Sequence, residues 1–158
     1  MQFLKLSIII LIMGCSNSNI ESAEKLWSSA SENRKLNNLH LAITNYKSII
    51  ENHAKTEYAV KSQFQIADIY LNDVKDYPFA INEFETLITN YPNDPIAKKA
   101  HFMVAYIYSN YLDAYSNAIE NYENFLEKYP NDELIPSVEF ELEGLSKYQV
   151  TIDSLNNL

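Results

Sequence analysis

The chain has 158 residues, with 21 acidic against 12 basic side chains and a formal net charge of −9 at pH 7. This charge disfavours nucleic acid and anionic lipid head groups as partners, because both bind basic surfaces. Only two glycines and one cysteine occur, which excludes a glycine-rich phosphate loop and a disulfide within one copy, and favours an all-helical chain.

The first predicted element is an export signal over residues 1–14. An apolar run follows Lys5 and ends in Ile-Met-Gly directly before the only cysteine, Cys15. The run is shorter than the roughly 20 residues that a helix needs to cross a bilayer, which favours a cleaved signal. Its end resembles a bacterial lipobox, and the resemblance implies lipidation of Cys15. The alternative is a buried strand or helix with Cys15 as an ordinary core thiol.

Residues 15–22 are predicted to form the lipidated N-terminus and a short tether, followed by one helical repeat domain over residues 23–158. Several acyl chains would hold the protein at a membrane. The five residues from Ser16 to Ile20 reach at most about 18 Å when extended. We therefore expect the domain to work close to the lipid surface.

Apolar residues then recur with a period of 38. Segments 42–53, 80–91 and 118–129 each place apolar residues at i, i+1, i+4, i+7 and i+8. This spacing forms one stripe on an α-helix. The three segments are therefore predicted to be three copies of one helix.

A second helix is predicted between these copies. Its residues at 64–70 reappear at 102–108, with a fainter copy near residues 26–29 and a last copy from Phe140 to Leu145. Asp94 and Pro95 favour a helix start there. The prolines after two tyrosines mark the preceding helix ends, at Tyr91-Pro92 and Tyr129-Pro130.

These segments resemble the tetratricopeptide repeat over about residues 23–148. The matching residues are small residues three positions before a tyrosine, alanines four positions before an aromatic residue, and prolines at the end of a unit. They are Ala67, Ala105, Ala80, Ala118, Pro92 and Pro130. The first unit departs from the pattern, as terminal units often do. The resemblance implies an all-α, tetratricopeptide-like α-solenoid of three helix pairs plus a C-terminal capping helix.

In such a solenoid the first helix of each pair lines a concave surface. The resemblance thus implies a partner-binding groove of aromatic and polar residues. Its predicted members are Phe64, Asp68, Leu71, Asn72, Phe102, Tyr106, Ser109, Asn110 and Phe140. For Phe64 and Phe102, a place in the core is as compatible with the spacing as a place in the groove.

The sequence carries no motif for catalysis. His40, His53 and His101 lack metal-ligand spacing such as H-E-x-x-H. Alternating carboxylates on the predicted helices are interpreted as solvated faces. We therefore predict no enzyme activity, no metal and no cofactor.

A lipidated cysteine, a short tether and repeats that end in Tyr-Pro-Asn-Asp resemble the periplasmic lipoproteins of the BamD type, which assist assembly of outer-membrane β-barrels. The resemblance implies a scaffold on the periplasmic side of the outer membrane that binds envelope proteins and no nucleic acid. The acidic surface favours basic or extended segments on these partners. The repeats are also similar to those of TolA-binding coordinator proteins. An accessory subunit of a cell-wall enzyme and a self-associating structural lipoprotein are further alternatives.

Overall fold

The computed structural model describes residues 21–156, with side chains described over residues 21–148. This part of the chain is helical throughout and contains no strand. Its elements are α1 (Ala23–Lys35), α2 (Leu39–Asn52), α3 (Glu57–Ile69), the π-helical turn η1 (Tyr70–Val74), α4 (Tyr77–Asn90), α5 (Pro95–Asn110), α6 (Tyr115–Lys128) and α7 (Ile135–Asn156). The predicted signal peptide and lipidated Cys15 lie outside the described residues.

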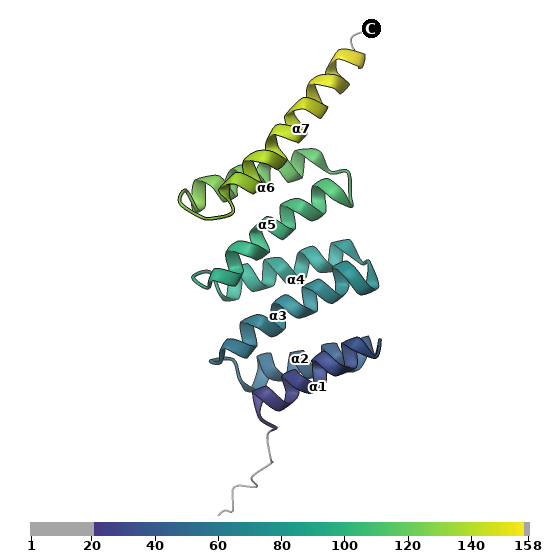
Figure 1. The fold of residues 1–158 in the computed structure, drawn as a ribbon, viewed down its shortest axis with the longest axis vertical. Helices are drawn as coiled ribbons and strands as arrows, with labels where there is room; N and C mark the ends of the chain where they lie inside the picture. The colour runs from purple at the N-terminus through teal and green to yellow at the C-terminus, as the bar shows by residue number, and fades with distance from the viewer. Residues whose placement is uncertain (1–20, 157–158) are drawn as a thin grey trace, which may run out of the picture.

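The helices stack as antiparallel pairs, α1 with α2, α3 with α4, and α5 with α6, and α7 leans against the last pair (Figure 1). Helices α2, α4 and α6 begin at Leu39, Tyr77 and Tyr115, so each start follows the previous one by 38 residues. The all-α solenoid of three pairs and a capping helix is therefore confirmed. The three turns inside the pairs lie along one edge of the stack, and the turns between pairs lie along the other (Figure 1).

Local signals set the helix ends where the sequence predicts them. The Asp94 carboxylate accepts a hydrogen bond from the backbone N–H of Ile96 at 2.8 Å, and Pro95 is the first residue of α5. Helices α4 and α6 end directly before Tyr91 and Tyr129. The turns inside the pairs show a further 38-residue recurrence, because a left-handed residue occurs at Asn37, Lys75 and Asp113.

Small residues let the helices approach one another closely. The side chains of Ala67 and Ala105 are fully buried in the first helices. The equivalent alanines of the second helices are also fully buried, and they are Ala42, Ala80 and Ala118. Large aromatic side chains fill the space between pairs, as Tyr46, Phe84 and Tyr122 do. Each pair therefore buries its apolar stripe partly against the next pair, which is why the stack must contain several units.

Helix α7 closes this core on one side only. Val138 and Leu145 face α6 and are buried, whereas Glu139, Glu143 and Lys147 are exposed. A polar outer face is what a terminal unit of a solenoid requires. None of the described helices is both long and apolar enough to cross a membrane.

Candidate partner-binding groove

Two clefts open beside α5, one toward α1 and α3 and the other toward the turn between α6 and α7. The inner cleft has a volume of about 270 Å³ and is lined by Trp27, Lys61, Phe64, Gln65, Ile96 and Lys99. The outer cleft has a volume of about 600 Å³ and is lined by Pro95, Ile96, Lys98, Lys99, Phe102, Met103 and residues 131–134. Ile96 and Lys99 line both, so we treat the two clefts as one groove.

The 38-residue repeat explains why these side chains share one surface. Lys61 and Lys99 occupy equivalent positions in α3 and α5, and so do Phe64 and Phe102. Residues three and four apart lie on the same helix face. The groove therefore runs across the middle of α3 and the first half of α5.

Aromatic contacts hold the apolar floor of the inner cleft. The Trp27 ring packs on Tyr46 with 5.3 Å between centroids. Phe64 makes an edge contact with Phe84 at 5.2 Å, and the Lys99 ammonium lies 4.9 Å from the centre of the Phe64 ring. An ammonium this close to an aromatic face is attracted to it. Lys99 therefore places a positive charge at the rim of this aromatic floor.

The two clefts differ in charge, because the outer cleft is lined by Asp132 and Glu133 as well as by Lys98 and Lys99. Of the described residues that line the inner cleft, Lys61 and Lys99 alone are charged, and Lys61 is paired with Glu57 at 2.6 Å. In the outer cleft, Lys98 donates to Asp132 at 2.9 Å. Hydrogen bonds from Lys98 and from a backbone N–H lower the pKa of Asp132. Among the described side chains, no carboxylate forms an ion pair with Lys99.

The second half of α3 is closed by a polar network centred on Arg34 of α1. The guanidinium donates to Asp68 at 2.6 Å, to Asp73 at 2.7 Å and to Gln65 at 2.9 Å. Burial opposes its charge, but hydrogen bonds and attraction from the two carboxylates raise the pKa of Arg34 above its usual value. The amide of Asn72 also donates to Asp68, at 2.8 Å. Asp68 is thus engaged within the fold.

The second half of α5 is covered by stacked aromatic rings. Tyr106 lies 6.2 Å from Phe102 and 6.0 Å from Tyr111, measured between ring centroids. Tyr111 in turn stacks on Tyr77 at 4.7 Å. The Asn110 amide donates to the backbone carbonyl of Tyr106 in its own helix, at 3.1 Å.

The structure brings only part of the predicted site together. Phe64 and Phe102 line the clefts. Leu71 is a correction, because it is 3% exposed and packs in the core with Phe84. It lies in the π-helical turn η1, whose wider turn rotates side chains away from the positions that regular α-helical spacing gives.

The remaining predicted residues are not among those that line the clefts. Tyr106 and Ser109 are half-buried, Asn72 and Asn110 are exposed, and Phe140 on α7 is 74% exposed.

The sequence-based prediction also missed residues that line the groove. They are Trp27 on α1, Lys61 on α3, and Ile96, Lys99 and Met103 on α5. Lys61 and Lys99 each lie three residues, or about one turn, before the predicted Phe64 and Phe102. The 38-residue repeat could have indicated two of them, because a lysine occupies the same repeat position in both units, as Lys61 and as Lys99. No group of three His, Cys, Asp or Glu side chains in the described part of the chain could hold a metal ion.

Comparison with known proteins agrees with this architecture. The family model YfiO, described as an outer membrane lipoprotein, matches residues 71–157, which is more than half of the chain. The match begins in η1 and covers α4 to α7, so it includes the second half of the groove. No curated protein matches the chain. The sequence-based resemblance to the BamD type is confirmed, and the chain belongs to the YfiO family of outer membrane lipoproteins.

Proposed function

We propose that this protein is a non-enzymatic scaffold that is anchored by lipid at Cys15 and assists the assembly of outer-membrane proteins from the periplasmic side. The observation that carries the proposal is the groove across α1, α3 and α5, which combines an apolar aromatic floor with lysines at its rim. An elongated cleft with these linings suits an extended peptide segment. Membership of an outer membrane lipoprotein family supports the location.

The charge of the groove favours a partner different from the one that net charge suggests. The whole chain is acidic, which alone favours basic segments. Among the described residues that line the inner cleft, however, the charged ones are Lys61, which is paired with Glu57, and Lys99, which is not paired with a carboxylate. Because local charge complementarity selects the bound segment, we propose that the groove takes an extended apolar segment bearing a carboxylate.

The lipid anchor is tested separately from the groove. Replacement of Cys15 by serine should release the protein from the membrane fraction, since the acyl chains supply the anchorage. Equal membrane retention of Cys15→Ser and the wild type would contradict lipidation at this residue.

The groove is tested with fluorescent extended peptides of one apolar sequence carrying either two glutamates or two lysines. We expect the full chain to bind the acidic peptide more tightly, and Lys99→Glu to weaken that binding at least about tenfold, which corresponds to roughly 1.4 kcal/mol. Lys47→Glu is the matched control, because Lys47 is exposed on α2 and lines neither cleft. Equal binding by Lys99→Glu and Lys47→Glu would refute this site.

The alternative function for the same fold is that of a self-associating structural lipoprotein. It predicts a mass in sedimentation that rises with protein concentration.

A further inference from the structure

The outer end of the groove carries a carboxylate that forms no ion pair within the described part of the chain. Glu133 lies in the turn between α6 and α7 and lines the outer cleft together with Asp132. Asp132 is paired with Lys98 at 2.9 Å, and its side chain is only 9% exposed. Glu133 is exposed and belongs to none of the ion pairs between described side chains. Glu133 is therefore the carboxylate of this cleft that remains for a bound segment.

The residues on either side of Glu133 are anchored to the fold. Asp132 accepts a hydrogen bond from Lys98 of α5 and another from the backbone N–H of Leu134, at 2.9 and 3.0 Å. Leu134 packs against the core cluster that contains Val138 of α7. Glu133 also attracts Lys98 and raises its pKa, but the hydrogen bond to Asp132 is the largest cause of that rise. The backbone that carries the Glu133 carboxylate is thus held from both sides.

The opposite charge lies toward the inner cleft. The Lys99 ammonium lies 4.9 Å from the centre of the Phe64 ring, and Phe64 lines the inner cleft but not the outer one. The outer cleft contributes the apolar side chains of Phe102 and Met103. The groove thus combines a positive charge at its inner cleft, an apolar floor and a negative charge of Glu133 at its outer end.

The separation of these two charges suits an extended chain. Packed helices lie about 8–10 Å apart, and half the width of a helix adds about 5 Å. A segment that runs from Phe64 on α3, across α5, to the α6–α7 turn therefore spans about 13–15 Å. An extended chain covers that distance in about four residues. Side chains that far apart point to the same side of an extended chain, so both can face the groove.

From these observations we propose that the groove selects a bipolar segment, in which a carboxylate and a basic side chain are about four residues apart. Lys99 binds the carboxylate, and Glu133 is the residue that selects the basic side chain. The inference rests on the proposed function, because it adds a second charge to the acidic, apolar segment proposed there. Opposite charges also fix which end of the segment lies over the inner cleft, because the reversed placement brings like charges together.

The test adds one charge to the fluorescent peptide that carries two glutamates. Two peptides place a lysine about four residues before or after the glutamates, and two matched peptides place a glutamine there. The full chain should bind at least one lysine peptide about threefold more tightly than its glutamine match, which is the size of effect that one exposed ion pair gives. Raised salt should remove this gain, because salt screens exposed charges.

Variants of the full chain assign the gain to one residue. Glu133→Gln should remove the preference for lysine over glutamine, and Glu133→Lys should turn it into a preference for glutamate at that peptide position. Both variants should melt as the wild type does, because Glu133 is exposed. Glu127→Gln is the matched control, because Glu127 is exposed on α6 and lines neither cleft.

The outcomes separate this proposal from the proposed function. The same preference for lysine in Glu133→Gln and Glu127→Gln would overturn the selection by Glu133, as would no preference in the wild type for either lysine peptide. Binding of the two-glutamate peptide that is weakened by Lys99→Glu would, in either case, leave the proposed function standing. Failure of the full chain to bind the two-glutamate peptide would overturn both.

Discussion

Replacement of Arg34 by methionine tests how the first helix pair is joined to the second. The change keeps much of the aliphatic stem and removes four contacts of 2.6–2.9 Å to Gln65, Asp68 and Asp73. A hydrogen bond to a charged group contributes about 1.5–3 kcal/mol when shielded, and an exposed ion pair about 0.2–1 kcal/mol. The Arg34 and Asp68 side chains are 21% and 24% exposed. We therefore expect an intermediate loss of about 2 kcal/mol in the free energy of unfolding.

The assay is urea unfolding followed by circular dichroism, with amide hydrogen exchange to locate the effect. Exchange should increase first in α1 and α2, because Arg34 links α1 to α3 and η1. Added salt should reduce the difference between Arg34→Met and the wild type, since screening weakens partly exposed charge pairs.

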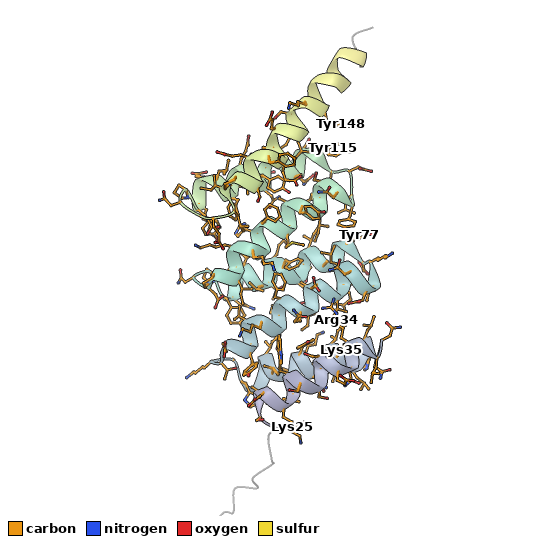
Figure 2. The ribbon with its side chains drawn as sticks, viewed as in Figure 1. Lys25, Arg34, Lys35, Tyr77, Tyr115 and Tyr148 are labelled. Carbon is orange, nitrogen blue, oxygen red and sulfur yellow. The ribbon has the colours of Figure 1, made fainter. Side chains whose placement is uncertain are left out.

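Lys25→Met is the matched control on the same helix (Figure 2). Lys25 is paired with Glu21 at 2.8 Å, but its side chain is 75% exposed, so its loss should change stability little. A cost of Arg34→Met no larger than that of Lys25→Met would refute the idea that the Arg34 network joins the two pairs.

Three other side chains give further predictions. Ala105→Leu should cost about 1–3 kcal/mol of stability by overpacking a fully buried position, whereas exposed Asn124→Ala should change it by less than about 0.5 kcal/mol; similar melting curves would contradict the packing. Tyr122→Phe should leave stability unchanged or raise it in thermal unfolding, because the buried Tyr122 hydroxyl has no hydrogen-bond partner among the described residues; a clear loss would reveal a partner. Burial, and then the Lys128 charge, lowers the pKa of His101 to about 4. The unfolded chain therefore takes up this proton first, and stability should fall as pH drops from about 6.5 towards 4. His101→Gln should flatten that part of the curve of denaturation midpoint against pH, and an unchanged slope would exclude His101 as its cause.

The helices and their order could be predicted from the sequence, because they depend on local signals. The 38-residue recurrence of apolar residues predicts helices at 42–53, 80–91 and 118–129, and α2, α4 and α6 lie there, each beginning three residues earlier. Asp94 with Pro95 predicts the start of α5. Side-chain periodicity and capping act within a few residues along the chain, so they can be read without knowledge of the tertiary contacts.

The groove could be predicted only in part, because its position depends on contacts between helices. Phe64 and Phe102 were among the expected residues, whereas Lys61 and Lys99 were not. The spacing of residues on one helix indicates which of them share a face. It does not indicate which part of that face a neighbouring helix covers.

Two features that the periodic pattern does not show decided where the groove is open. Arg34, which lies 34 residues from Asp68 along the chain, closes the second half of α3. The π-helical turn η1 buries Leu71. An ion pair between distant residues and a local change of helical pitch leave no periodic signal in the sequence. The sequence by itself therefore determined the repeat and its helices, and the packing of one unit on the next determined which surfaces stay accessible to a partner.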